Sequence, residues 1–387
     1  MSYPIKKELR PAYGFDDVAI APGRVTINPE MVDTTMSIPS PNGTGPVELG
    51  IPIMASAMDA IVDPQFAIHL GKLGGLAVLN LNGIHVRYED VTEIYADIAA
   101  ATLEESTPLM QKIYEEPIKE DLVARRVQQI KSGGVKCAVA TIPATTKKLA
   151  PIASEAGADV IVVAATITTV RHRSKSARGL IFSELVEQIK KPIVVGNTVS
   201  YDVTLELMHQ GISGVLVGVG PGAACTSREV LGIGVPQVTA TIDCAAARDE
   251  YFKQTGRYVP IITDGGIRTG GDVCKSFASG ADAVMIGTPF AQAEESPGRG
   301  FNWGMATPDA SLPRGTRITV GTKAPLEQIL FGPSSLTDGT MNLVGALRNC
   351  MGIVGAMDLK EMHETELMLA PSIKTEGKIY QRAQAGG

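Results

Sequence analysis

The sequence predicts an α/β protein: a (β/α)8 TIM barrel that forms a single domain with long loop insertions. Eight short runs of apolar and β-branched residues recur along the 387 residues, and helical spacing fills most of the intervals between them. Such runs are typical of strands buried on both faces of a parallel sheet. Glycine-containing turns at 156–159 and 279–282 end a helix and lead into the next strand. Eight units in series favour a closed barrel, with an open doubly wound sheet as the alternative.

The elements follow in chain order. The predicted strands are 51–56, 76–82, 137–142, 160–166, 193–197, 214–218, 259–265 and 283–287. The clearest helical segments are 66–73, 122–130, 182–189, 203–209 and 273–278. The long interval 82–137 is interpreted as helices, and the Gly- and Pro-rich stretch of roughly 288–340, which contains Trp303, as a mobile flap. The whole chain, 1–387, is therefore predicted to be one catalytic domain.

Composition excludes several classes of protein. The chain is 44% hydrophobic and 20% charged, with a net charge of −6 and no dense run of Lys or Arg, so it is not expected to bind nucleic acid. It has no signal-peptide pattern and no apolar run long enough to span a membrane. The five cysteines form no C-x-x-C pair and the five histidines show no metal spacing, which favours a reducing cytoplasm over a disulfide or zinc scaffold.

The loop after the sixth predicted strand carries the strongest chemical signal. Glycines at 218, 220 and 222 free the backbone to approach a ligand, and Cys225 follows them. At the catalytic face of a barrel, the nearby Arg228 and backbone amides would favour a nucleophilic thiolate. The alternative is that Cys225 is a small buried apolar residue, which is how we interpret Cys137 and Cys274.

The loops after the last two strands resemble a phosphate site. The segment 264–272 and the pair Gly287–Thr288 supply glycines and a hydroxyl where barrels commonly hold phosphate, and Asp264 can accept hydrogen bonds from a ribose. Together they suggest a nucleoside monophosphate or a sugar phosphate. The alternative is that these glycines only make tight turns.

These segments together resemble one family. The chain is similar to the IMP dehydrogenase / GMP reductase family of (β/α)8 barrels over nearly its whole length. The resemblance rests on 52–59 (PIMASAMD), 196–197 (GN), 220–225 (GPGAAC), 234–237 (GVPQ), 264–268 (DGGIR), 280–287 (GADAVMIG) and 343–348 (LVGALR). It implies a form without the family's regulatory CBS pair, because the interval after the second strand is too short to hold one.

The resemblance also implies roles. Cys225 would attack C2 of the purine, Ser227 would stand beside it, and Arg314 would be the base for the hydrolytic step. The implied nucleotide-binding residues are Ser56, Met58, Asn197, Asp264, Gly266, Gly287, Thr288, Gly304 and Met305. NAD is the implied cofactor, near Gly218, Gly220 and Thr166. A monovalent cation such as K⁺ is a candidate at the carbonyls of Gly220, Gly222 and Cys225. A cytoplasmic homo-oligomer, a tetramer or octamer, is also implied.

Four positions depart from the family pattern. Ala223 replaces a serine that donates to phosphate, and Ser227 replaces a threonine but keeps the hydroxyl. Ala164 stands where an aspartate commonly contacts the cofactor, so NAD would be held differently or more weakly. Gly315 replaces the tyrosine that usually follows the catalytic arginine, which weakens the match at Arg314.

Three hypotheses follow. The first is an IMP dehydrogenase of guanine nucleotide biosynthesis, which converts IMP to XMP with NAD⁺ through a covalent intermediate on Cys225. The second is a GMP reductase, which converts GMP and NADPH to IMP and ammonia. That chemistry requires a glutamate, and the predicted flap offers Glu327 without a clear alignment. The third is a non-catalytic purine-nucleotide sensor, which would have no need of the Cys225 thiol.

Overall fold

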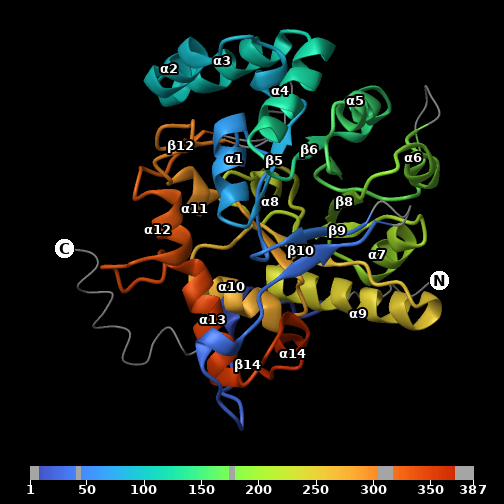
Figure 1. Cartoon of the computed structure of the whole chain (residues 1–387), viewed down its shortest axis with the longest axis vertical. Helices are drawn as coiled ribbons and strands as arrows, with labels where there is room; N and C mark the ends of the chain where they lie inside the picture. The colour runs from blue at the N-terminus through green and yellow to red at the C-terminus, as the bar shows by residue number, and fades with distance from the viewer. Residues whose placement is uncertain (1–7, 41–44, 174–178, 304–316, 371–387) are drawn as a thin grey trace, which may run out of the picture.

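The computed structural model describes residues 8–40, 45–173, 179–303 and 317–370. Its centre is a closed barrel of eight parallel strands, which confirms the predicted architecture and excludes the open sheet (Figure 1). The barrel strands are β4 (Ile53–Ala55), β5 (Leu76–Asn80), β6 (Ala138–Thr141), β7 (Val160–Ala164), β8 (Ile193–Thr198), β9 (Gly214–Val217), β10 (Ile261–Asp264) and β11 (Ala283–Ile286). Each lies within or overlaps one of the eight predicted runs, and β11 pairs with β4 to close the ring.

Helices surround the barrel, as expected when a parallel sheet is buried on both faces. One follows each strand: α1 (Pro64–Lys72), α4 (Glu120–Ser132), α5 (Pro143–Glu155), α6 (Phe182–Gln188), α7 (Tyr201–Met208), α9 (Gln237–Thr255), α10 (Gly270–Ala278) and α13 (Leu343–Val354). All five predicted helical segments are confirmed. Side chains cap several N-termini; Asp63, for example, accepts from the amide of Phe66 at 2.7 Å. Within the described ranges, no helix has both the length and the apolar content needed to cross a bilayer.

The remaining helices and strands lie outside the barrel. The interval between β5 and α4 is helical, as predicted, and contains α2 (Thr92–Ala100) and α3 (Leu103–Glu115). Shorter helices are α8 (Ser227–Leu231), α11 (Thr288–Ala291), α12 (Leu326–Phe331), α14 (Leu359–His363), η1 (Phe15–Asp17), η2 (Pro29–Met31) and η3 (Ile84–Val86). Three antiparallel pairs join β1 (Val18–Ile20) to β14 (Leu367–Leu369), β2 (Met36–Ile38) to β3 (Val47–Leu49), and β12 (Phe301–Asn302) to β13 (Ile318–Thr319).

The predicted flap is more structured than expected. Between 288 and 340, the described residues form α11, the β12–β13 pair and α12. Trp303, which lies in this stretch, is 2% exposed, and its indole N–H donates to Tyr114 at 3.1 Å. Three implied site residues of this stretch, Gly304, Met305 and Arg314, lie outside the described residues.

The predicted glycine turns do more than end helices. Gly157 takes a φ of +108°, which only glycine adopts readily, and the turn delivers Asp159 to the start of the preceding strand. There its carboxylate accepts from the amide of Cys137 at 2.7 Å and pairs with Lys131 of α4 at 2.7 Å.

The second glycine turn repeats this arrangement. Gly280 has a φ of +99°, and Asp282 accepts from the amide of Ile261 at 2.8 Å. Its partner is Arg248 of α9, at 2.9 Å. In both turns the aspartate joins the start of one strand to the start of the next.

Candidate active site

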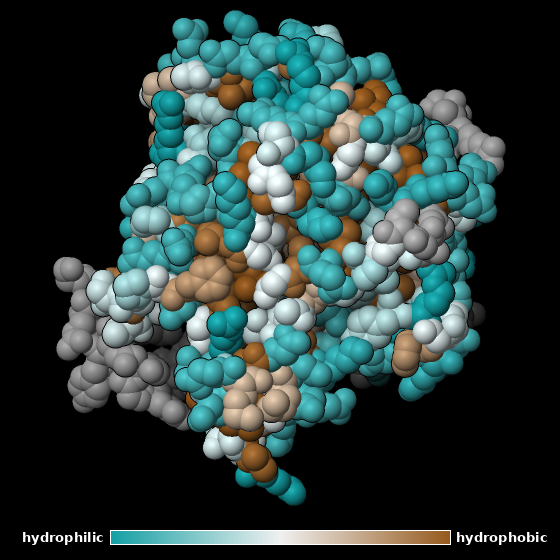
Figure 2. All heavy atoms as spheres, viewed as in Figure 1, coloured by the Kyte–Doolittle hydropathy of each residue, from teal (hydrophilic) through white to brown (hydrophobic). Residues whose placement is uncertain are grey.

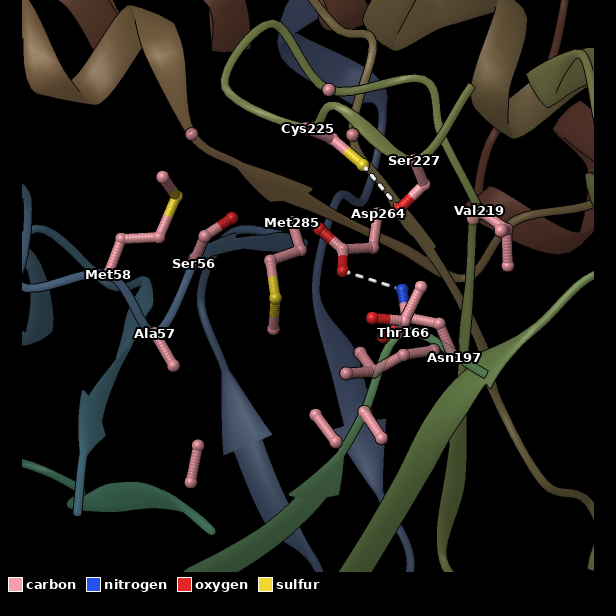
Figure 3. Close-up of a pocket in the computed structure, with 18 of the residues that line it drawn as sticks. Ser56, Ala57, Met58, Thr166, Asn197, Val219, Cys225, Ser227, Asp264 and Met285 are labelled. Atoms are coloured by element: carbon pink, nitrogen blue, oxygen red, sulfur yellow. Dashed lines mark hydrogen bonds between the residues drawn. The ribbon is translucent and has the colours of Figure 1, made fainter. Parts of the chain in front are cut away.

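A cavity of about 1000 Å³ opens at the carboxyl ends of the barrel strands. Every implied site residue that the structure describes lines it: Ser56, Met58, Thr166, Asn197, Gly218, Gly220, Gly222, Cys225, Ser227, Asp264, Gly266, Gly287 and Thr288. These residues come from loops as far apart in sequence as 56 and 288, so the barrel alone brings them together. Figure 3 shows the Cys225–Ser227 pair and the Asp264–Asn197 pair facing the same space, with Ser56 and Met58 to one side.

The glycine-rich loop after β9 is held tightly against its neighbours. A side chain at Gly218 would place its Cβ 2.0 Å from the carbonyl oxygen of Asp264, so only glycine fits there. The amide of Val235 donates to the carbonyl of Val219 at 3.1 Å, and the side chain of Gln237 donates to the carbonyl of Val217 at 2.6 Å. The segment 234–237 therefore holds the loop in place.

Cys225 is half-buried at the end of this loop. Its thiol donates to the hydroxyl of Ser227 at 3.4 Å, and its amide donates to the carbonyl of Gly222 at 3.1 Å. Arg228 packs against Gly220 and donates to the carbonyl of Val235 at 3.2 Å. These contacts join the glycine-rich loop to the segment 234–237.

Asn197 and Asp264 form a polar pair at the bottom of the cavity. The Asn197 side-chain amide donates to the Asp264 carboxylate at 2.8 Å. The ladder between β8 and β9 shifts register at Asn197, and such an irregularity re-aims a side chain. Burial raises the pKa of Asp264 to about 6, while the hydrogen bond from Asn197 lowers it. The pair therefore offers an acceptor whose charge changes near neutral pH.

A second wall of the cavity combines the loops after β4 and β11. The amide of Ser56 donates to the carbonyl of Ile286 at 3.0 Å, which aligns the two loops. A Cβ at Gly287 would lie 3.7 Å from the sulfur of Met58 and 3.8 Å from the hydroxyl of Ser56. The absence of a side chain at Gly287 therefore keeps this corner of the cavity open.

Sequence reasoning missed Asn302. This residue of β12 is 1% exposed, lines the cavity and donates to the hydroxyl of Thr288 at 3.4 Å. Its side-chain oxygen has no hydrogen-bond partner among the described residues. A buried acceptor of this kind is expected to meet a ligand donor or water. The available signal was an amide between two aromatic residues, Phe301 and Trp303.

From the corner lined by Ser56, Met58 and Gly287, the cavity extends toward the ends of β5, β6 and β7. Ala164 lies at the end of β7, and Lys147 and His172 line the same region. Of the described residues that line the cavity, Asp264 is the only carboxylate. The described part of the chain contains no group of three or more His, Cys, Asp or Glu side chains that could hold a metal ion.

The other cysteines lie in different surroundings. Burial raises the pKa of Cys137 and of Cys244 to about 12, so both thiols stay protonated. Cys274 is buried on α10, and its thiol donates to the carbonyl of Ala346 at 3.5 Å. Of the cysteines in this chain, only Cys225 lines the cavity.

Comparisons with known proteins agree with this arrangement. The sequence model of the IMP dehydrogenase / GMP reductase domain matches residues 12–310. A Mycolicibacterium smegmatis protein named as an uncharacterized oxidoreductase is 38% identical over 92% of this chain and 96% of its own. The inosine-5'-monophosphate dehydrogenase of Cryptosporidium parvum is 29% identical over 90% of this chain and 89% of its own.

A solved structure has the same fold. It is the crystal structure of an IMP dehydrogenase/GMP reductase-like protein from Corynebacterium glutamicum, with a TM-score of 0.88 and 33% sequence identity. The match covers 95% of this chain and 97% of the other.

Proposed function

The chain belongs to the IMP dehydrogenase / GMP reductase family, and on that premise we propose that it is an oxidoreductase that converts IMP to XMP with NAD⁺. The observation that carries this proposal is the position of Cys225. Its thiol lies in the cavity on the same side as the Asp264–Asn197 pair, where a ribose would be held beside a reactive sulfur. A site that only bound a nucleotide would not need a nucleophile at this place.

The first step is covalent. The Cys225 sulfur donates an electron pair to C2 of the purine, and a C–S bond forms. The hydrogen on C2 then leaves with its electron pair, and a thioimidate on Cys225 remains. Bound NAD⁺ supplies the acceptor for that hydride. Ser227, 3.4 Å from the sulfur, accepts the thiol hydrogen bond and is proposed to relay the outgoing proton.

The second step is hydrolysis. Water adds to C2, the C–S bond breaks, and the Cys225 thiol is restored as XMP forms. This step requires a base that takes a proton from water. Arg314, implied by the family resemblance, is our candidate for this base.

The nucleotide is proposed to lie along the wall of Ser56, Met58 and Gly287. Asp264 would accept hydrogen bonds from the ribose, and Thr288 would donate to the phosphate near Gly266. Gly304 and Met305 would contact the purine edge. Asn302 is added to this set, because its buried side-chain oxygen faces the cavity without a partner among the described residues.

The cavity fits a second ligand beside the nucleotide. Its volume of about 1000 Å³ lies at the upper end of the ~300–1,000 Å³ usual for small-molecule sites. NAD⁺ would enter near Gly218, Gly220 and Thr166, past Ala164. A potassium ion at the carbonyls of Gly220, Gly222 and Cys225 is also proposed. One of these, Gly222, already accepts from the Cys225 amide at 3.1 Å.

GMP reductase is the second candidate. Its chemistry requires a carboxylic acid that protonates ammonia, and Asp264 is the only carboxylate among the described residues that line the cavity. Because we propose that Asp264 holds the ribose, it is not free to protonate ammonia, and this favours the dehydrogenase. A nucleotide sensor is the third candidate, supported by Ala164 and Ala223. We further propose a cytoplasmic homo-oligomer, a tetramer or octamer.

Absorbance at 340 nm separates these candidates. With IMP and NAD⁺, the dehydrogenase produces a rise that Cys225→Ala abolishes, whereas Cys244→Ala, at a buried thiol outside the cavity, leaves it in place. A fall with GMP and NADPH, without a rise from IMP, would identify the reductase. Nucleotide binding without either change would identify the sensor.

A further inference from the structure

A tyrosine outside the cavity joins two of the cavity's walls. The hydroxyl of Tyr114, on α3, donates to the carboxylate of Asp59 and accepts from the indole N–H of Trp303 at 3.1 Å. Asp59 directly follows Met58, and Trp303 directly follows Asn302. All three linked side chains are buried, with exposures of 1% for Asp59, 6% for Tyr114 and 2% for Trp303.

Asp59 is the fixed end of this connection. Its carboxylate also accepts from the amide of Ile84 at 3.2 Å and from the side chain of Asn80 at 3.5 Å. A Cβ at Gly83 would lie 1.9 Å from a carboxylate oxygen of Asp59, so the backbone at Gly83 comes closer to this carboxylate than any other residue would permit. The position of the loop that carries Met58 is thus set by contacts outside the cavity.

The α2–α3 hairpin holds the β12–β13 pair from a second side. Arg317, next to β13, donates to the carbonyl of Ala101 at 2.6 Å and to the carbonyl of Ile98, both near the end of α2. Its guanidinium lies 4.3 Å from the ring centre of Phe301 in β12. Figure 1 shows α2 and α3 next to each other at one end of the molecule, with β12 close by. The hairpin therefore contacts residues that flank both strands of the pair, Trp303 after β12 and Arg317 before β13.

The hairpin presents its two faces to different surroundings. Its inner face is buried, and the hydroxyl of Tyr95 on α2 donates to the carbonyl of Asp59 at 2.6 Å. Figure 2 shows a mainly hydrophilic outer surface at the end of the molecule that α2 and α3 form. Tyr95 and Tyr114 of the hairpin thus make buried hydrogen bonds to the loop after β4 and to the residue that follows β12.

Building on the proposed function, we propose that Tyr114 is a positioning residue for the nucleotide. It does not touch the cavity. Its hydroxyl group bonds to both Asp59 and Trp303, which follow the cavity residues Met58 and Asn302 in the chain. Tyr114 thereby fixes the distance between the cavity wall formed by 56–58 and the wall formed by Asn302 and Thr288. The nucleotide affinity of the barrel would therefore depend on a helical hairpin inserted between its second strand and its second helix.

The test is Tyr114→Phe, which keeps the ring and removes the shared hydroxyl. Losing two buried hydrogen bonds is expected to weaken the binding of IMP by roughly ten-fold, measured by calorimetry, with a matching rise in KM and a smaller change in kcat. Trp303 is the only tryptophan of the chain, so tryptophan emission reports the surroundings of this one residue. The emission of Tyr114→Phe should differ from that of wild type, and IMP should alter it less.

The matched control is Tyr88→Phe. Tyr88 also donates its hydroxyl to α3, to the carbonyl of Ile113 at 2.9 Å, but it bonds to neither Asp59 nor Trp303. This variant should lose stability without a change in IMP affinity or tryptophan emission. If Tyr114→Phe lowers Tm and leaves IMP binding at the wild-type value, Tyr114 is only structural and the inference is wrong.

A second variant identifies the route of the effect. Trp303→Phe removes the other half of the bridge, so combining it with Tyr114→Phe should weaken IMP binding no more than the worse single change. Fully additive losses would contradict a shared connection. Wild-type protein that binds no purine monophosphate would overturn the proposed function, and this inference with it, whereas normal binding by Tyr114→Phe overturns the inference alone.

Discussion

The side-chain amide of Asn197 lies 2.8 Å from the carboxylate of Asp264, although the strands that carry them, β8 and β10, are not neighbours. The strand between them is β9, whose loop leads to Cys225. The hydrogen bond between the two side chains therefore spans β9, the strand that leads into the loop of Cys225. At the start of that loop, Gly218 packs so closely against Asp264 that no side chain fits at position 218. An ionisable group and a nucleophile are thus built on one rigid support.

Nucleotide affinity is expected to fall as pH decreases through about 6, the pKa to which burial raises Asp264. Above that pH the carboxylate is charged and accepts hydrogen bonds from the ribose, and below it the proton removes part of this acceptor capacity. The measurement is the dissociation constant of IMP between pH 5 and pH 8.5. The phosphate of IMP also titrates at about pH 6, so Asp264→Asn should bind weakly and keep only the shallower pH dependence of the phosphate; identical pH profiles for the variant and the wild type would contradict the assignment.

The same substitution should stabilise the fold at pH 8. The pKa of Asp264 is higher in the folded protein than the ordinary 3.8, so its stabilising contribution is complete below pH 3.8 and is lost as pH rises through about 6. A rise from 3.8 to about 6 corresponds to roughly 3 kcal/mol at most, less where water in the cavity screens the charge. Thermal unfolding should show Asp264→Asn above wild type at pH 8, with the difference shrinking toward pH 4. If Asp264→Asn had a lower Tm than wild type at both pH 8 and pH 4, the surroundings of the Asp264 carboxylate would compensate its charge.

Gly218→Ala should strongly reduce both activity and stability, because its Cβ would collide with the backbone of Asp264 at 2.0 Å. Gly232→Ala is the control. It follows α8 in the same region with a φ of +68° and nothing within 4 Å of the added Cβ, so it should cost only about 1 kcal/mol of backbone strain. Comparable kcat/KM values for the two variants would mean that the loop tolerates displacement.

Restoring the family residues should improve binding of one ligand at a time. Ala223→Ser returns a hydroxyl near the phosphate and is expected to lower the KM for IMP a few-fold. Ala164→Asp returns a carboxylate at the end of β7 and is expected to lower the KM for NAD⁺. Each variant serves as the control for the other in steady-state kinetics. An improvement in NAD⁺ binding from Ala223→Ser alone would place the two ligands the other way round.

Arg314→Ala should separate the two chemical steps. Hydride transfer does not need the proposed base, so rapid mixing should show a burst of absorbance at 340 nm, equal to the enzyme concentration, followed by slow turnover. Mass spectrometry of the same sample should find the covalent adduct on Cys225. Turnover at the wild-type rate would remove Arg314 from the mechanism.

The barrel could be predicted from sequence because its signals are local. Apolar runs such as 160–166 and turn glycines such as Gly157 act within a few residues. The residues that line the cavity could be predicted because strand ends and family motifs coincide at Cys225 and Asp264. The contacts of Asp59 and Asn302 could not, because they depend on the packing of α3 and β12, which no local pattern encodes. The burial of Trp303 against Tyr114 could not be predicted for the same reason.

The two glycine turns are related by half a revolution of the barrel. Asp159 joins β6 to β7 and Asp282 joins β10 to β11, four strands further on, and each takes its cation, Lys131 or Arg248, from the helix that precedes the first of its two strands. Each half of the barrel thus contains its own ion pair between an aspartate and a cation, at the amino-terminal ends of the strands, opposite the cavity. A chain divided between β7 and β8 would keep one such ion pair in each fragment, so this junction is the natural place to attempt reassembly from two fragments.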